Sequence, residues 1–332
     1  MFSAARAPAK TILLGEHFCV HGAPAISMAV NLYAEARVRK GVEAGIHVSS
    51  RGLKAAGLFH GGRYKAEVGG KAGGRLLRPI KIAAEAVLDY AGSPPLDLDV
   101  EVESGIPIQV GLGSSAAMAV STVAAVARFV GLKLSREEVL RLSYFSERLL
   151  HYRPSGIDQA TCIHGGIIFF QQGAPVKFLK AARPLRLVVG NTGIRRSTGV
   201  LVKKVSSLAE EREALMRKNL KAARRLTLQA AEAIRRGDLP QLGRCMDENQ
   251  KLLSAVGVSH KRLELFIEAA RNAGALGAKL TGGGGGGCMI ALARGEDLEN
   301  VAKALQRLHG ETYLVETDER GLRSWVGKGC VG

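Results

Sequence analysis

A short stretch rich in glycine and serine, at residues 111–117, has the composition of a phosphate-binding loop. Small residues let the main chain approach an anion closely, and the helix that follows would add free amide groups and the positive end of its dipole. Ser114 and Ser115 could cap that helix, contact phosphate or hold a magnesium ion. The stretch lacks the lysine of a Walker A loop and the setting of a dinucleotide fingerprint. Taken alone, it is equally consistent with an ordinary serine-capped helix.

Six consecutive glycines, at residues 282–287, form a second unusual segment. Glycine loses more conformational entropy on ordering than any other residue, so such a run within a folded region is costly. Strand-like residues on both sides argue against a flexible linker. We therefore expect a ligand or a second loop to approach this main chain so closely that a Cβ would not fit.

A few charged and titratable residues could supply acid–base chemistry. Asp158 follows a Pro-Ser-Gly turn at residues 154–156, which would hold its carboxylate at a fixed angle. Lys10 lies on a predicted strand, and Glu16 and His17 lie in the turn after it. Judged separately, each of these groups is also common as a helix cap or in a salt-bridged surface turn.

Alternating strand and helix patterns must position these segments. Apolar and acidic residues alternate at 96–102, which predicts a half-buried strand, and apolar spacing predicts a helix at 79–90. Ser135 and Glu138 have the spacing of a capping box. The glycine-rich region 41–74 predicts hairpins and an exposed loop. Further strands are predicted at 10–14, 34–38, 165–170, 185–189, 278–280, 288–293 and 313–316, and further helices at 116–130, 135–150, 199–237, 239–256 and 261–273.

This alternation favours a mixed α/β or α+β enzyme of two domains, which we divide into residues 1–185 and 186–332. The net charge of +17 suggests a nucleic-acid binder, but the basic residues are scattered, so that role is not expected. The five cysteines are dispersed and include no CxxC pair, which favours the cytoplasm over a disulfide framework or a zinc site. Glu16 and His17 interrupt the first apolar stretch, and no stretch is long enough to cross a membrane.

Taken together and in order, the segments at 8–17, 111–117 and 279–287 resemble the signature regions of the GHMP kinases. This superfamily includes galactokinase, homoserine kinase, mevalonate kinase and phosphomevalonate kinase, and the resemblance covers nearly the whole chain. Within it, the sequence is most similar to the mevalonate kinases, through the Gly-Glu-His turn with the Gly-Ala-Pro-Ala-Ile that follows, at 15–26, and through the run 249–281.

The resemblance implies an N-terminal ATP-binding domain like domain 2 of ribosomal protein S5, and a ferredoxin-like C-terminal domain. It also implies ATP-dependent phosphorylation of mevalonate to 5-phosphomevalonate in isoprenoid biosynthesis, with Mg²⁺, in a cytoplasmic homodimer. Asp158 would accept the proton of the attacking hydroxyl, and Lys10 would stabilise charge beside it. ATP would be bound by Gly111, Leu112, Gly113, Ser114, Ser115 and Ala116; the acceptor by Glu16, His17, Thr198, Gly283 and Gly284; and the metal by Ser114 and Glu147.

Several alternatives stay open at the level of sequence. Tyr152 and Arg153 replace other residues of the usual pattern beside Asp158, so the acceptor could instead be that of a phosphomevalonate kinase or a mevalonate 3-kinase. A related decarboxylase of diphosphomevalonate is a further alternative. A non-catalytic nucleotide-binding regulator on the same fold is disfavoured because Lys10, Glu147 and Asp158 are all present.

Overall fold

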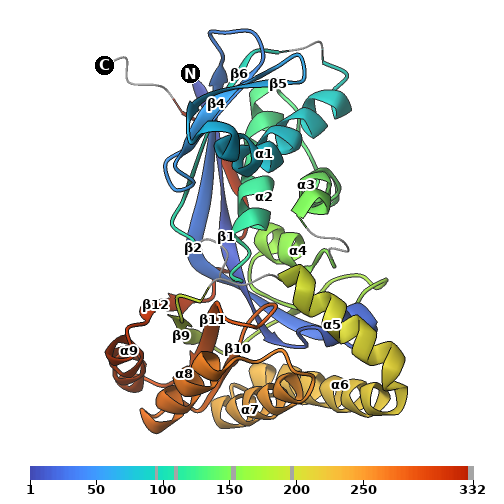
Figure 1. The fold of residues 1–332 in the computed structure, drawn as a ribbon, viewed down its shortest axis with the longest axis vertical. Coiled ribbons are helices and arrows are strands. Elements are labelled where there is room, and N and C mark those ends of the chain that lie inside the picture. Colours follow the sequence, from blue (N-terminus) through green and yellow to red (C-terminus); the bar gives the residue numbers. More distant parts are fainter. Residues whose placement is uncertain (94–95, 108–110, 151–154, 195–197, 328–332) are drawn as a thin grey trace.

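The chain forms two β-sheets with helices packed against them (Figure 1). The computed structural model describes residues 1–93, 96–107, 111–150, 155–194 and 198–327, except for the side chains of residues 147–150 and 198. The larger sheet has the strand order β13-β1-β2-β6-β3-β4-β5, and β7 joins it by pairing with β2 and β8. Its strands are β1 (Phe2–Leu14), β2 (Ala25–Lys40), β3 (Ile46–Ser50), β4 (Ala55–His60), β5 (Arg63–Val68), β6 (Leu98–Ser104), β7 (Ile167–Phe170), β8 (Lys177–Leu179) and β13 (Arg323–Gly327).

The smaller sheet has the order β10-β11-β9-β12 and lies in the second half of the chain. Its strands are β9 (Arg186–Asn191), β10 (Gly277–Leu280), β11 (Cys288–Leu292) and β12 (Glu311–Glu316). The helices of this half are α5 (Thr198–Glu211), α6 (Glu213–Arg236), α7 (Leu239–Ala255), α8 (Lys261–Asn272) and α9 (Asp297–Arg307). In the described part of the chain, none of the helices combines the length and apolarity that a bilayer crossing requires.

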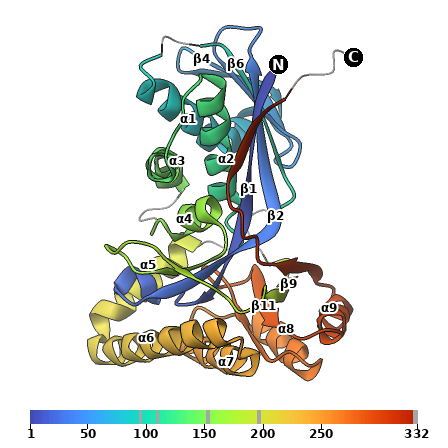
Figure 2. The same cartoon turned by 180° about the vertical axis from the view of Figure 1, so that it is seen from behind.

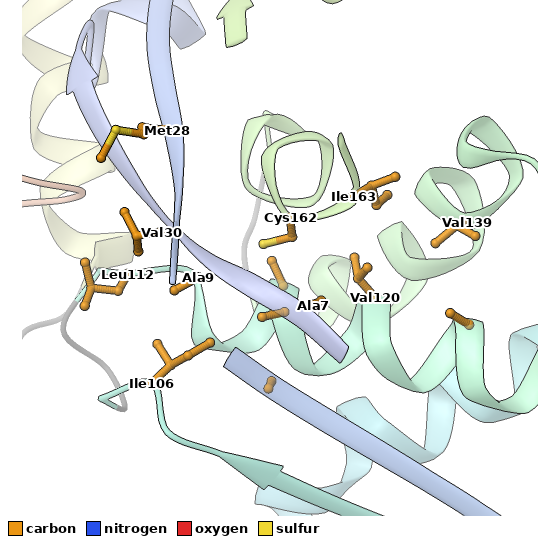
Figure 3. Packing of buried hydrophobic residues seen from close by; sticks show 14 of the residues in the cluster. Ala7, Ala9, Met28, Val30, Ile106, Leu112, Val120, Val139, Cys162 and Ile163 are labelled. Carbon is orange, nitrogen blue, oxygen red and sulfur yellow. The ribbon is translucent and has the colours of Figure 1, made fainter. Parts of the chain in front are cut away.

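The helices of the first half build the core that supports the loop at 111–117. They are α1 (Gly70–Tyr90), α2 (Ser114–Phe129), α3 (Arg136–Leu150) and α4 (Ile157–His164), with a short 3-10 helix η1 (Phe18–His21). Nearly all of α2 is buried, because it packs against β1, β2, α1 and α3 at once. Figure 3 shows Ala7 and Ala9 of β1 among apolar side chains of α2 and α4. Their small size lets both helices lie close to the strand.

Several local predictions are confirmed. Leu98, Val100 and Val102 of β6 are fully buried while the acidic residues between them are not, as the alternation predicts. The capping box is also present, because Glu138 N donates to Ser135 Oγ at 3.2 Å and Ser135 N donates to Glu138 Oε2 at 2.7 Å. The sequence therefore determines these two elements locally.

Other predictions were wrong in extent. Helix α1 begins at Gly70, not near residue 79, and it contains Pro79. A Cβ on Gly74 would lie 2.6 Å from the ring of Tyr64, so this glycine permits close packing and does not mark a loop. By contrast, the region 199–237 is mostly helical, as predicted, and it consists of two helices, α5 and α6, which are separated at Arg212.

The boundary predicted at residues 185 and 186 falls between β8 and β9, where the chain passes from the larger sheet to the smaller one. The last strand, β13, nevertheless returns to the larger sheet and pairs antiparallel with β1, with Phe2 opposite Gly327. Figure 2 shows this return as the red ribbon beside the blue strand β1. A division into 1–185 and 186–332 thus separates two strands that are hydrogen-bonded neighbours, and it remains a proposal.

An ion cluster in the larger sheet joins side chains of the three strands β3, β5 and β6. His47 of β3 lies with Nδ1 2.8 Å from Asp99 Oδ1 and Nε2 3.1 Å from Glu67 Oε2. Partial burial lowers the pKa of His47, but the hydrogen bonds and charges of the two carboxylates outweigh this and raise the pKa above its ordinary value of 6.5. When protonated, His47 therefore links β3 to its neighbour β6 and to β5, which lies beyond β4.

Candidate active site

The loop before α2 has the geometry of an anion site. Gly111 and Gly113 have φ values of +98° and +71°, and Gly113 is the residue that caps α2. The main chain of Leu112 accepts a hydrogen bond of 2.9 Å from Lys10 N, which fixes the loop to β1. The amides at the start of α2 and its positive dipole end are thereby held in place beside Lys10.

Ser114 is the first residue of α2, and its side chain is directed into the protein. It is only 7% exposed, and among the described residues no group forms a hydrogen bond with its buried Oγ. A buried hydroxyl without a partner costs about 1–3 kcal/mol. The cost is removed if a phosphate oxygen or a metal ion contacts this hydroxyl when nucleotide binds.

Asp158 and Lys10 form an ion pair beside this helix start. Lys10 Nζ lies 2.8 Å from Asp158 Oδ1, the lysine side chain is 3% exposed and the aspartate side chain is 31% exposed. A Cβ on Gly113 would lie 2.8 Å from Lys10 Cγ, so the lysine stem passes directly over the cap of α2. The resemblance implied that Lys10 and Asp158 lie close together, and the structure places both beside Gly113.

A helix that the sequence did not predict sets the position of Asp158. Asp158 lies in the first turn of α4, which starts after Gly156 with a φ of +81°. The Pro-Ser-Gly turn suggested a loop residue or a helix cap, but the eight residues after Gly156 form a helix. Asp158 therefore projects from a helix end, whose orientation depends on how α4 packs.

The Gly-Glu-His turn after β1 is held from within the protein. Glu16 is 1% exposed and forms an ion pair with Lys279 of β10, which is fully buried. Asn249 of α7 donates a second hydrogen bond of 3.2 Å to Glu16 Oε2. Burial raises the pKa of Glu16 and lowers that of Lys279, because each charge has left water. This carboxylate joins the two halves of the molecule.

His17 adopts an unusual backbone conformation next to this pair. Its φ is +61°, which is uncommon for a residue with a Cβ and is concentrated at functional sites. Its Nε2 lies 3.1 Å from the carbonyl oxygen of Gly283. Two segments that the resemblance assigns to the acceptor pocket, 266 positions apart, thus meet in space.

The six-glycine segment is a folded loop between β10 and β11. Positive φ angles occur at five of its residues: Gly282, Gly284, Gly285, Gly286 and Gly287. A Cβ on Gly284 would lie 2.1 Å from the carbonyl oxygen of Val258, and one on Gly286 would lie 2.6 Å from Ile194. The expected close approach is therefore made, at least in part, by neighbouring chain segments, and the alternative of a flexible linker is excluded.

Two predicted site residues cannot be placed in full. Glu147 lies in α3 and Thr198 begins α5, but the side chains of both lie outside the described residues. Tyr152 and Arg153 lie outside them entirely. Ser115 is partly exposed in the first turn of α2, and Ala116 is buried behind it.

Comparison with known proteins gives two family matches. The GHMP kinases N terminal domain model matches residues 78–166, and the GHMP kinases C terminal model matches residues 230–311. The mevalonate kinase of Pyrococcus horikoshii is 39% identical over 96% of each chain. The chain belongs to the GHMP kinase family. Similar proteins and solved structures indicate which members of the family it resembles.

Solved structures of GHMP kinases agree with the fold over nearly all of the chain. The L. major mevalonate kinase in complex with R-mevalonate superposes with a TM-score of 0.81 at 28% identity, covering 95% of each chain. The Methanococcus jannaschii mevalonate kinase gives a TM-score of 0.80 at 25% identity, covering 95% of this chain and 98% of that one. The mixed α/β two-domain GHMP kinase fold is therefore confirmed.

The resemblance to kinases implies a divalent cation bound with the nucleotide, and the residues present fit one. Mg²⁺ takes few protein ligands and several from water and phosphate, so a hydroxyl and one carboxylate are sufficient. The buried, unpartnered Oγ of Ser114 is a suitable oxygen. The described residues contain no group of three or more acidic, histidine or cysteine side chains that would form a complete cage. Such a cage is not what a nucleotide-bound Mg²⁺ requires.

Sequence reasoning missed the residues that hold the site from the second half of the chain. Lys279, the partner of Glu16, was noted only as part of a motif. Thr281 was likewise given no role, yet its Oγ1 lies 3.0 Å from Thr11 Oγ1 and accepts from Ile12 N at 3.1 Å. Their burial was not evident from sequence, because a lysine and a threonine next to a glycine run usually face solvent.

Proposed function

We propose that this chain catalyses the ATP-dependent phosphorylation of mevalonate to 5-phosphomevalonate. The single observation that carries the proposal is the Lys10–Asp158 ion pair at the start of α2. It combines a carboxylate that water can reach with a lysine stem over a glycine cap, where a triphosphate is expected to bind. The 39% identity to a mevalonate kinase over nearly the whole chain supports mevalonate as the acceptor.

In this proposal, the hydroxyl oxygen of mevalonate attacks the γ-phosphorus of ATP. A new O–P bond forms, the bond from the γ-phosphorus to the bridging oxygen breaks, and ADP leaves with that electron pair. Asp158 accepts the hydroxyl proton, and Lys10 stabilises the negative charge that develops on the transferred group. Phosphoryl transfer depends mainly on such positioning and charge stabilisation.

The remaining site residues are assigned on the same basis. The main chain of Gly111, Leu112 and Gly113, with Ser114, Ser115 and Ala116, binds the ATP phosphates. Ser114 and Glu147 hold Mg²⁺, which offsets the phosphate charge when it is bound. The acceptor pocket is assigned to His17, Thr198, Gly283, Gly284 and Glu16. The His17–Gly283 contact supports this grouping, and the burial of Glu16 supports a role through the shape of its turn.

We also propose that the enzyme acts in the cytoplasm as a homodimer. The described cysteines, at positions 19, 162, 245 and 288, form no disulfide, which supports a reducing compartment. Sedimentation of the purified chain across a range of concentrations tests the dimer. A single species with a mass near 35.2 kDa at every concentration would refute it.

The proposed reaction is tested by measuring ADP release with a panel of acceptors: mevalonate, phosphomevalonate, diphosphomevalonate, galactose and homoserine. We expect turnover with mevalonate alone, and a 5-phosphorylated product by ³¹P NMR. A product phosphorylated at the 3-hydroxyl, or carbon dioxide release from diphosphomevalonate, would replace the assignment by another member of the family. Nucleotide binding without turnover on any acceptor would refute the enzyme proposal.

A further inference from the structure

The helix that carries Asp158 cannot hold its own position. Helix α4 has only eight residues, and isolated helices of this length are not stable in water. Its amino-terminal end follows a glycine with a φ of +81°. The packing of its sides and the contacts at its carboxyl end must therefore fix where Asp158 points.

The carboxyl end of α4 is in contact with a distant part of the chain, residues 318–322. Leu322 N donates a hydrogen bond of 3.2 Å to the carbonyl oxygen of Ile163. A Cβ on Gly165 would lie 2.4 Å from Gly321 N, and a Cβ on Gly321 would lie 2.5 Å from the Ile163 carbonyl oxygen. Main chain therefore packs directly on main chain, which only glycine permits at these two positions.

Asp318 organises residues 318–322. Its Oδ1 accepts hydrogen bonds from Gly321 N at 2.7 Å and Arg320 N at 3.1 Å, so the carboxylate fixes the turn. Its Oδ2 accepts from the Tyr33 hydroxyl at 2.7 Å and from Arg323 at 3.1 Å. The residue is 6% exposed, and all four donors approach one carboxylate. Such a buried, fully satisfied carboxylate is costly to alter.

The main chain of Asp318 extends this connection to the larger sheet. Gly166 N donates to the Asp318 carbonyl oxygen at 2.6 Å, and Asp318 N donates to the Ala29 carbonyl oxygen at 2.9 Å. Ala29 N in turn donates to the Gly166 carbonyl oxygen at 2.9 Å. The end of α4, strand β2 and Asp318 thus form one closed set of hydrogen bonds.

We propose that Asp318 is a positioning residue for phosphoryl transfer: it shapes the turn at 318–322, whose main chain holds the carboxyl end of α4 and so keeps Asp158 beside Lys10. The inference rests on the proposed function for its kinetic consequence. Asp318 lies outside both regions that the family models match, 78–166 and 230–311. The positioning is therefore supplied by the part of the chain that follows the second matched region.

Two variants test the proposal in different ways. Asp318→Asn keeps the size of the side chain, but it places an NH₂ group, which donates hydrogen bonds, next to groups that are themselves donors. Gly321→Ala leaves Asp318 intact and presses a methyl group on the Ile163 carbonyl oxygen, at a residue whose φ is +67°. Asp238→Ala is the matched control, because Asp238 caps α7 through Gln241 N and forms no hydrogen bond or ion pair with α4 in the described part of the chain. It should lower stability without moving Asp158.

Two measurements are made on each variant. In hydrogen–deuterium exchange, the amides of residues 157–164 should exchange at least about 10-fold faster in both test variants than in the wild type. In the control, their exchange rates should equal those of the wild type. In steady-state kinetics well below the unfolding temperature, kcat should fall about 10- to 100-fold, because small displacements of a catalytic group are costly. The KM for ATP should stay within about 2-fold of the wild-type value, because neither substitution changes the loop before α2.

The outcomes separate the two proposals. Faster exchange in α4 with an unchanged kcat would overturn the positioning role, as would exchange no faster than in Asp238→Ala. If Asp318→Asn does not fold, Gly321→Ala decides alone by the same criteria. A wild-type chain that turns over no acceptor refutes the proposed function independently of any variant, since that measurement does not involve Asp318.

Discussion

The Lys10–Asp158 pair gives the sharpest test of the proposed active site, because the side chains of its two members differ in their exposure to solvent. In Asp158→Asn, the ammonium of Lys10 stays in a site that is 3% exposed and loses the negative charge of its partner. We expect a loss of about 1–3 kcal/mol in the free energy of unfolding, below the range for a fully buried pair because water reaches Asp158. In Lys10→Met, an apolar side chain of similar length fills a buried site and leaves a carboxylate that is 31% exposed. We expect less than about 1 kcal/mol of change.

The kinetic effects should be similar for the two variants despite this difference in stability. Loss of the proton acceptor should lower kcat about 100- to 10,000-fold, and loss of the charge beside it about 100- to 1,000-fold. Because both groups act on the same transferred phosphoryl group and attacking oxygen, the double variant should be within about 10-fold of the slower single variant. ADP release in a coupled assay gives kcat, and urea unfolding gives stability.

A matched control is Lys251→Met on α7. Lys251 pairs with Glu248 at 2.6 Å, but both side chains are more than half exposed, so kcat and stability should change little. Two results would refute the reasoning about the site. One is normal turnover in Asp158→Asn, and the other is a double variant whose loss equals the product of the two single losses.

Three further predictions concern the metal, pH and thiol chemistry. Ser114→Ala should raise the Mg²⁺ concentration for half-maximal activity, and Ser115→Ala should raise it less; equal shifts would remove Ser114 as the ligand. Because the folded-state pKa of His47 is raised above 6.5, its contribution to stability is fully present below pH 6.5 and is lost as pH rises through the folded pKa. Thermal unfolding of the wild type should show this loss, and His47→Gln should not; identical pH profiles would contradict it. Burial, followed by the nearby carboxylates, raises the pKa of Cys19 to about 12, so iodoacetamide at pH 8 should label it in urea but not in the folded chain, as peptide mass spectrometry would reveal.

The sequence predicted the parts of the site that are local or that carry a motif. The loop before α2, the helix after it and the capping box of α3 follow from residue types within a few positions. The proximity of Lys10 and Asp158 came from the resemblance, not from any pattern, because 148 residues separate them.

What the sequence could not predict depends on contacts made late in the chain. Nothing near Asp158 indicates α4, since eight residues carry too little periodicity and Gly156 reads as a turn. The burial of Glu16 depends on Lys279, and the support of α4 depends on Gly321. In each case a polar or glycine residue has a role only through a partner more than 150 positions away.

The pairing of β1 with β13 has a consequence for biosynthesis. Of the strands and helices described in the structure, β1 is the first that the ribosome makes, and its edge partner β13 is the last. Until then, the main-chain amides of β1 on that side have no strand to bind, and such an open edge invites pairing with other nascent chains. The protein therefore completes its first sheet last, and chaperones that shield β-edges would matter most to this enzyme while its second half is being translated.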